Sequence, residues 1–381
     1  MESSTFIVNV GLLLRGWSLD VERDVNVEVR DGVIASIGHG FSCERNSITF
    51  RHGIAIPALV NAHLHVFDYA FQEAGLELKL PELVSEPHGL KHRLISSLSE
   101  EELRRAALEV CSTLSRQGVY LALTFCERLD AVKVLRGASE VTGVRLAALV
   151  RPRRLDDGSL SFEGLLDEAD GVGLDSPLRY SCEGLKWIKS ECSKRSKLVS
   201  THISETSSSR LKGDLELALR CLNPDVVVHA THLDESGIEA LEARDIAVVV
   251  CPRSNMWFSC GLPPLKLLLE KGVKLLIGTD NAGWVNPDLW RELEAVYNIL
   301  RLQSSRADPK EVLKMATINI HLVRGLKAPS NVIDEGVEAN FVILDGLSMG
   351  ADSSHNLYST IVKRGSESRV LCRVYGGRML N

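Results

Sequence analysis

The middle of the chain alternates short apolar runs with amphipathic stretches, and this alternation restricts the fold more than any other feature. Strands that alternate with helices are typical of parallel β/α units. Eight runs in order favour a closed (β/α)8 barrel over an open doubly wound sheet. The predicted strands are residues 54–60, 119–124, 144–150, 171–174, 197–201, 225–228, 246–250 and 273–279.

Both ends of the chain have a different pattern, with apolar and polar residues alternating between turn signals. Neither end alone offers enough strands to bury a hydrophobic face, so we expect the two ends to form one small β-sandwich domain. The predicted strands near the C-terminus are residues 341–345, 359–365 and 369–377. The predicted organisation is residues 1–56 for the first part of the β-sandwich, 57–328 for the barrel and 329–381 for the second part.

One long connection follows the first predicted strand of the barrel. Residues 66–98 show no clear element, and the next helix begins with a capping box formed by Ser99 and Glu102. Connections of this length in compact domains are usually lids or binding loops. The alternative is a disordered surface insertion.

Composition limits the classes of function. The net charge of -6 and the absence of a long basic run argue against a nucleic-acid surface, and no apolar run is long enough to cross a membrane. We therefore expect a cytoplasmic protein with a small-molecule substrate, and we keep a homodimer as an open alternative. Nine cysteines without a C-x-x-C pair exclude a zinc ribbon.

Histidine and acidic residues stand where the predicted strands end. His63 and His65 are two residues apart on an extended segment, so both imidazoles point to the same side. His202, His229 and Asp280 end the fifth, sixth and eighth runs. Because the carboxyl ends of barrel strands open on one face, these side chains are predicted to converge on a metal site.

Glu205 lies three residues beyond His202, where the chain has just left its strand. A carboxylate beside a metal-bound water is suited to moving protons. The alternative for this residue is a solvated loop acid or a helix cap.

Five motifs together resemble the amidohydrolase superfamily, and within it the branch of cytosine deaminase and the chlorohydrolases. The motifs are PALVNAHLH at 57–65, HISE at 202–205, HATHL at 229–233, CPRSN at 251–255 and GTD at 278–280. The resemblance extends to residues 334–345, which look like the family's return to its β-domain.

The resemblance implies a ligand set and roles. His63, His65, His202 and Asp280 would hold one divalent metal, zinc or alternatively iron. Glu205 would move protons between water and the substrate nitrogen, and His229 would orient the attacking water without being a principal ligand. Asp280 would also accept the water's proton. Relatives with two metals use a carboxylated lysine after the fourth strand, and its absence here favours a mononuclear site.

Two departures from the family pattern concern the substrate more than catalysis. The usual Pro-Gly before the first strand is Pro57-Ala58, and the usual Asn-Pro is Cys251-Pro252. Substrate recognition is therefore assigned to a wider set of residues. The candidate substrate-binding residues are His88, Lys91, His92, Arg93, Arg151, Ser254, Asn255 and Trp284.

Three functions remain open at this point. The first is hydrolytic deamination of an amino-substituted heterocycle, which Glu205 favours because ammonia release needs a proton donor. The second is ring opening by a cyclic amidohydrolase of the imidazolonepropionase kind. The third is a catalytically silent barrel that serves as a binding or assembly protein, a hypothesis that predicts lost ligands.

Overall fold

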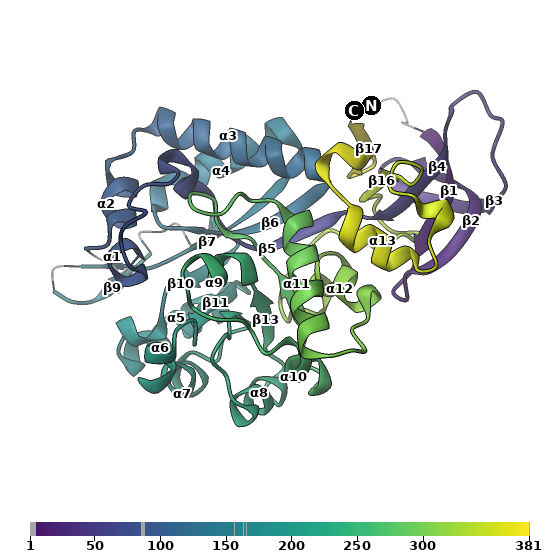
Figure 1. Ribbon diagram of the computed structural model, residues 1–381. Helices are drawn as coiled ribbons and strands as arrows, with labels where there is room; N and C mark the ends of the chain where they lie inside the picture. The colour runs from purple at the N-terminus through teal and green to yellow at the C-terminus, as the bar shows by residue number, and fades with distance from the viewer. Residues whose placement is uncertain (1–4, 85–87, 156, 163, 165, 381) are drawn as a thin grey trace.

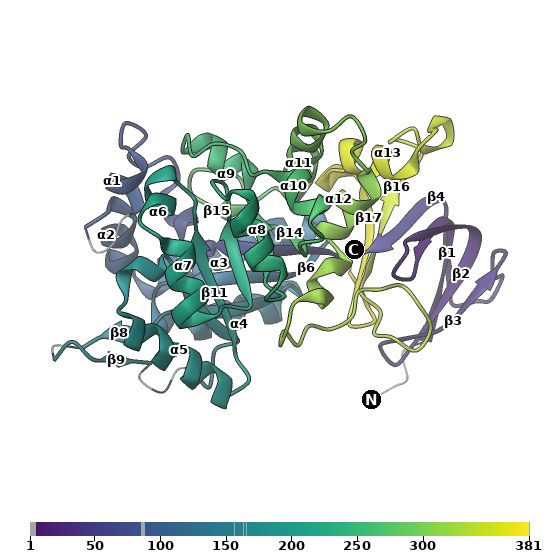
Figure 2. The same cartoon turned by 90° about the horizontal axis from the view of Figure 1, so that it is seen from below.

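The structure of the protein, a computed structural model, describes residues 5–84, 88–155, 157–162, 164 and 166–380. A barrel with its helices makes up most of the molecule. A second sheet lies at one end of it, where the purple strands of the N-terminal region meet the yellow strands of the C-terminal region (Figures 1 and 2).

The predicted eight-stranded parallel barrel is confirmed. Its sheet has the order β14-β13-β12-β11-β10-β7-β6-β5-β15; the last predicted run, 273–279, contains β14, and the short strand β15 follows directly after it. Because β14 pairs with β13 while β15 pairs with β5, these two strands close the barrel. The strands are β5 (Leu59–His65), β6 (Val119–Cys126), β7 (Arg145–Val150), β10 (Gly171–Leu174), β11 (Leu198–Ile203), β12 (Val226–His229), β13 (Ala247–Val250), β14 (Leu275–Ile277) and β15 (Asp280–Asn281).

The first predicted run is wrong in its bounds, because residues 54–60 cross from one sheet to the other. Residues up to Pro57 belong to β4 (Ser47–Pro57) of the second sheet, and β5 begins at Leu59. The backbone N–H of Ala58 donates to Asn340 O, and that of Leu59 donates to Gly118 O. The chain is buried throughout this change of partners, so no polar turn marks it in the sequence.

Helices follow the strands, and α3 (Glu100–Gln117) begins at the capping box that was predicted from the sequence. Ser99 accepts a hydrogen bond from the backbone of Glu102, and Gly118 ends the helix with φ 90°. Over the described part of the chain, no helix is both long and apolar enough to cross a membrane. The remaining helices of the barrel are η2 (Leu129–Ala131), α4 (Val132–Thr142), η3 (Pro177–Arg179), α5 (Cys182–Lys194), α6 (Ser207–Leu211), α7 (Asp214–Leu217), η4 (Ala218–Leu222), α8 (Glu235–Glu242), α9 (Pro252–Trp257), α10 (Leu265–Glu270), α11 (Leu289–Gln303), α12 (Pro309–Met315) and η5 (Ile318–Leu322). A short hairpin of β8 (Arg153–Arg154) and β9 (Leu160–Ser161) lies after β7.

The sequence showed no clear element in the long connection after β5, but this connection contains short helices in the structure. It contains η1 (Val66–Phe71), α1 (Leu80–Val84) and α2 (Leu90–Ser97), while residues 85–87 lie outside the described residues. Phe67 and Asp68 of η1 are fully buried. Helices this short have too few turns to show an apolar periodicity, so they could not be predicted from the sequence.

The two chain ends form one mixed sheet of order β18-β17-β16-β4-β1-β2-β3, as predicted from their alternating patterns. β16 pairs antiparallel with β4, placing Phe341 opposite Pro57. Residues such as Val8, Val27 and Val374 pack with Phe341 into a hydrophobic core separate from that of the barrel. The other strands are β1 (Thr5–Arg15), β2 (Asp20–Arg30), β3 (Val33–His39), β16 (Phe341–Asp345), β17 (Val370–Tyr375) and β18 (Arg378–Leu380).

The strand predicted at residues 359–365 is wrong, because this segment belongs to helix α13 (Leu357–Arg364). Asn356 caps the helix by accepting a hydrogen bond from the backbone of Ser359. The β-branched run Thr360-Ile361-Val362 is buried. Tertiary packing therefore overrides the strand propensity of these residues. Single turns lie on either side, η6 (Ala351–Ser353) and η7 (Glu367–Arg369).

Two of the nine cysteines form a disulfide. Cys182 at the start of α5 is bonded to Cys221 in η4, across a sequence separation of 39 residues. Of the other seven, all but Cys43 are buried. The buried thiols act as small apolar side chains, as their scattered positions indicated.

Candidate metal centre and active site

Four side chains from three parts of the barrel meet at the carboxyl ends of its strands. His63, His65, His202 and Asp280 each offer a ligand atom, and these atoms lie within 4.8 Å of one another. His63 and His65 come from β5, His202 from β11 and Asp280 from β15. The structure thus brings together the four residues that the sequence predicted as metal ligands.

The first and last strands of the barrel are braced beside this group. The Nδ2 atom of Asn61 donates to Thr279 Oγ1 at 2.7 Å, and the backbone of Thr279 donates to Asn61 Oδ1 at 3.1 Å. A Cβ at Gly278 would lie 2.7 Å from the Cβ of His63, so only glycine allows this close approach. These contacts set His63 and Asp280 side by side.

The donor atoms of the group face each other, and all but that of His202 belong to buried residues. The Nε2 atom of His63 lies 3.0 Å from His202 Nε2 and 3.1 Å from Asp280 Oδ1. The Nε2 atom of His65 lies 3.5 Å from the same carboxylate oxygen. The group thus places three imidazole nitrogens around one carboxylate in a largely buried region. This set of donors suits a divalent cation.

Burial keeps these groups in the protonation states that bind cations. Desolvation lowers the pKa of His63 to about 4, and it lowers the pKa of His202 well below its usual range. For Asp280, burial opposes ionisation, but the hydrogen bond with His63 and the neighbouring imidazoles hold the pKa well below the usual range. At neutral pH His63 and His202 are therefore neutral and Asp280 is charged, whereas the carboxylate of Glu127 helps to raise the pKa of His65 against the effect of burial.

Glu127, which the sequence analysis did not single out, is bonded to one of the predicted ligands. It directly follows β6, and its Oε1 atom lies 2.6 Å from His65 Nδ1. The carboxylate accepts a hydrogen bond from Nδ1–H, which leaves Nε2 of His65 without a proton and free for a cation. An acid directly after a barrel strand was the available signal, the same one that identified Asp280.

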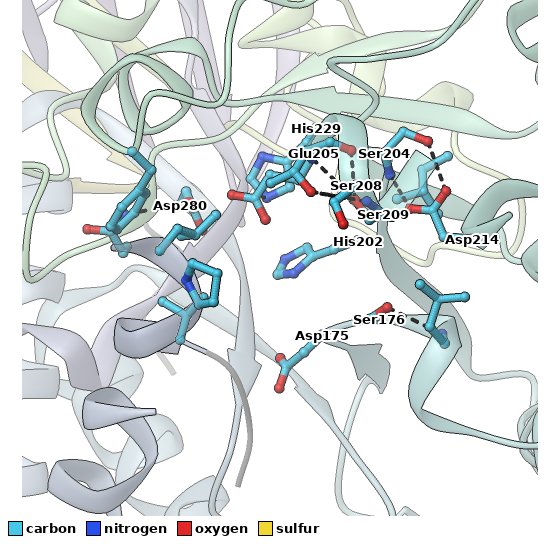
Figure 3. A pocket seen from close by; sticks show the side chains of 18 of the residues that line it. Asp175, Ser176, His202, Ser204, Glu205, Ser208, Ser209, Asp214, His229 and Asp280 are labelled. Carbon is cyan, nitrogen blue, oxygen red and sulfur yellow. Dashed lines mark hydrogen bonds and ion pairs between the residues drawn. The ribbon is translucent and has the colours of Figure 1, made fainter. Parts of the chain in front are cut away.

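Glu205 and His229 lie together beside the metal group. The Nε2 atom of His229 is 3.8 Å from Glu205 Oε1, and both residues line the same cavity (Figure 3). Burial raises the pKa of Glu205, which favours its carrying a proton. The Cys260 thiol donates to Glu205 Oε1 at 3.7 Å, while His232 Nε2 donates to the Cys260 carbonyl at 2.6 Å. His232 thus lies beside the thiol that contacts Glu205, and it is not among the four clustered ligand candidates.

Two site residues have backbone conformations that are unusual for non-glycine residues. His229 has φ 74° and Asp280 has φ 64°, both in the left-handed region. Such conformations cost about 1–3 kcal/mol each and cluster at functional sites, where the surrounding structure holds them in place. Here they occur at the ends of two strands and turn both side chains toward the same cavity.

The CPRSN motif forms the start of α9 and lies behind the site. The Oγ atom of Ser254 donates to Asp280 Oδ2, and Asn255 contacts His229. Both side chains are fully buried, and neither lines the cavity. The structure therefore places these two candidates for substrate binding against the proposed catalytic side chains.

The cavity has a volume of about 440 Å³ and opens beside the metal group. Of the other candidates for substrate binding, Lys91, His92 and Trp284 line it, and His88 and Arg93 are exposed outside it. Arg151 is not among the residues that line the cavity, but it donates a hydrogen bond at 2.6 Å to the Oδ2 atom of Asp175, which does line it. Asp175 lies across His202 from Glu205 and His229 (Figure 3).

The chain combines a closed parallel barrel, a sheet formed by both chain ends, and three histidines and one aspartate at the carboxyl-terminal face of the barrel. This combination defines the class of metal-dependent hydrolases of the amidohydrolase type. The model of the amidohydrolase family matches residues 54–380. The chain belongs to this family, as the motifs had indicated.

The relatives and the solved structure described here match most of the length of the chain. A putative aminohydrolase of Methanothermobacter thermautotrophicus is 28% identical over 98% of each chain. A 5-methylthioadenosine/S-adenosylhomocysteine deaminase of Pyrococcus furiosus is 26% identical, covering 89% of this chain and 86% of the relative. The crystal structure of an adenosine deaminase of Xanthomonas campestris with bound zinc has a TM-score of 0.84 at 19% identity, with 98% and 92% of the two chains covered.

Proposed function

We propose that this protein is a mononuclear zinc enzyme that hydrolytically deaminates an amino-substituted heterocycle, either a base or a nucleoside. The observation that carries the proposal is the position of Glu205. Its partly buried carboxylate, 20% exposed, lies 3.8 Å from His229 in a cavity that is also lined by His65, His202 and Asp280. A proton donor in that place is what the loss of an amino group requires.

The residues of the site divide the chemistry among them. His63, His65, His202 and Asp280 would hold the cation, which supplies a water molecule whose pKa falls to about 7 on zinc. Asp280 accepts the proton that this water gives up as its oxygen bonds to the ring carbon. Glu205 donates a proton to the amino nitrogen, and the carbon–nitrogen bond breaks to release ammonia. The ring carbon keeps the water oxygen as a hydroxyl group, which becomes a carbonyl when its proton moves to the neighbouring ring nitrogen.

His229 has a role that differs from that of the ligands. Its Nε2 atom faces Glu205, and its ring is 1% exposed. A hydrogen bond from this nitrogen orients the attacking water and stabilises the charge that develops on its oxygen.

The cavity and the names of relatives support an aromatic amino substrate. A volume of about 440 Å³ is within the range of small-molecule sites, and Phe258 and Trp284 provide aromatic surface in its wall. The two deaminases described above are named for substrates that carry an adenine ring. We infer that the ring lies against this aromatic wall with its amino group toward Glu205, and that Lys91, His92 and Asp175 meet the polar substituents.

The zinc-loaded protein should be tested on a panel of amino-substituted bases and nucleosides together with cyclic amides, scoring ammonia release and ring opening separately. We expect ammonia from at least one adenine nucleoside and no ring-opened product. Ring opening of a cyclic amide without ammonia from any amino heterocycle would overturn the proposal in favour of a cyclic amidohydrolase.

A further inference from the structure

A buried lysine lies between two buried carboxylates next to the metal group. The Nζ atom of Lys91 is 3.0 Å from Asp68 Oδ2 and 3.0 Å from Glu127 Oε1. The three side chains are 6%, 0% and 2% exposed, respectively. Burial lowers the pKa of Lys91, but the two carboxylates more than offset this effect and raise it above the ordinary value.

One atom joins this cluster to a proposed metal ligand. The Oε1 atom of Glu127 that contacts Lys91 is also the atom 2.6 Å from His65 Nδ1. A continuous chain of contacts therefore runs from Lys91 through Glu127 to His65. The other carboxylate oxygen, Oε2 of Glu127, is buried without a hydrogen-bond partner among the described residues.

The lysine comes from the long connection and not from the barrel. Lys91 lies in α2, and Asp68 lies in η1 at the start of the same connection. Both residues also line the cavity. The ion pair thus ties the two ends of the connection to each other and to the carboxylate that holds His65.

We propose that Lys91 is a positioning residue for the metal centre, which orients His65 by holding Glu127 in place. On this view the described part of the connection at residues 66–98 supports the metal site and also forms a wall of the substrate cavity. The inference rests on the proposed function, because it requires that His65 binds a cation.

Replacing either Lys91 or Glu127 should weaken the support of His65. Without Lys91, two buried carboxylates lose their counter-charge and must rearrange or take up protons. Without the charge of Glu127, His65 loses the strong acceptor that fixes its ring and its tautomer. Both changes disturb the same ligand, so their effects on metal affinity are not independent.

The test is a double-mutant cycle read in zinc affinity. The variants are Lys91→Met, Glu127→Gln and the double variant, and each is titrated with zinc alone against a chromogenic chelator. We expect each single change to weaken zinc binding by roughly 10- to 100-fold, as is usual for partners of metal-binding histidines. The double variant should bind zinc about as weakly as the weaker single variant.

Lys189→Met is the matched control, because Lys189 also pairs with a buried carboxylate, that of Asp225, at 3.2 Å. Asp225 precedes β12, at the end of the barrel away from the metal group, so zinc affinity should stay at the wild-type value. Lys91→Arg, which keeps the charge, should restore most of the affinity. If Lys91→Met does not fold, Lys91→Gln takes its place in the cycle.

The spectrum of the cobalt-substituted protein gives a second measurement, since a reoriented His65 changes the d–d bands while a distant structural effect leaves them unaltered. Effects that multiply in the double variant, or single variants that bind zinc like Lys189→Met, would overturn the inference while leaving the proposed function intact. A wild-type protein that binds no zinc would instead overturn both.

Discussion

The Nδ2 atom of Asn255 lies 3.1 Å from the Nδ1 atom of His229, in a region where both side chains are buried. An amide nitrogen donates, so Nδ1 of His229 accepts and the ring proton is left on Nε2. Nε2 is the atom that faces Glu205. Asn255 thus selects the form of His229 that presents a hydrogen-bond donor to the cavity.

Replacing Asn255 with aspartate should reverse this selection. The carboxylate would accept a hydrogen bond and so favour the tautomer that carries its proton on Nδ1. Nε2 would then have no proton, and His229 could no longer donate toward the water. We expect Asn255→Asp to lower kcat by at least about tenfold, because catalytic hydrogen-bond donors typically contribute that much or more. Steady-state kinetics with metal analysis checks this, and zinc content should not change, since His229 is not among the four ligands. A normal kcat would show that the tautomer of His229 is not important for turnover.

Glu205→Gln should remove the proton donor while keeping the shape of the site. Proton transfer by a positioned side chain contributes about 100- to 10,000-fold, so we expect kcat to fall within this range. Zinc content should match the wild type, because Glu205 is outside the ligand group. Ammonia release measured on zinc-loaded protein tests the prediction. A variant with close to the wild-type rate would exclude Glu205 as the proton carrier.

Asp280→Ala should weaken metal binding directly. Asp280 supplies the single negative charge among the four ligands, and its Oδ1 atom lies 3.1 Å from His63 Nε2. Its loss leaves three neutral imidazoles, which hold a divalent cation less tightly. Elemental analysis after dialysis against a weak chelator should show a lower metal-to-protein ratio than in the wild type. An unchanged ratio would place the metal elsewhere.

Glu292 should give the stability of the protein a specific pH dependence. It is fully buried in α11 and accepts from the backbone of Arg253 at 2.9 Å, and burial raises its pKa to about 8 despite the nearby guanidinium. A carboxyl group with a raised pKa favours folding while it is protonated. Its contribution is therefore fully present below the unfolded pKa and lost as the pH rises through about 8.

We expect Glu292→Gln to gain stability relative to the wild type as the pH rises from about 5 to about 8. Denaturant unfolding of the two proteins across this range measures the difference in free energy of unfolding. A difference that is constant with pH would mean that Glu292 titrates normally in the folded protein.

The barrel and the ligands could be predicted because their signals are local and repeated. The run at residues 171–174 matches β10 in full, although it has only four residues, since buried parallel strands are apolar throughout. His202, His229 and Asp280 could be placed because barrel strands end on one face. Helix α13 could not be predicted, because its β-branched residues have the composition of a strand and only packing decides between the two.

The partners of the ligands depend on distances that the sequence does not contain. Glu127 looks like an ordinary acid after a strand until Lys91, 36 positions earlier, is found 3.0 Å away. The change of sheet at Ala58 is likewise invisible, since the chain stays buried on both sides of it. Which residues line the cavity was only partly predictable, because Ser254 and Asn255 share a motif with the site but face away from the substrate space.

We claim that this chain removes an amino group with a metal-activated water. The most direct test incubates the zinc-loaded protein with an adenine nucleoside in water enriched in oxygen-18 and analyses the product by mass spectrometry. We predict that a heavy oxygen replaces the amino nitrogen, that ammonia appears in equal amount, and that chelation of the zinc abolishes both. If amino-substituted bases and nucleosides all keep their nitrogen in the presence of the zinc-loaded protein, the claim is contradicted.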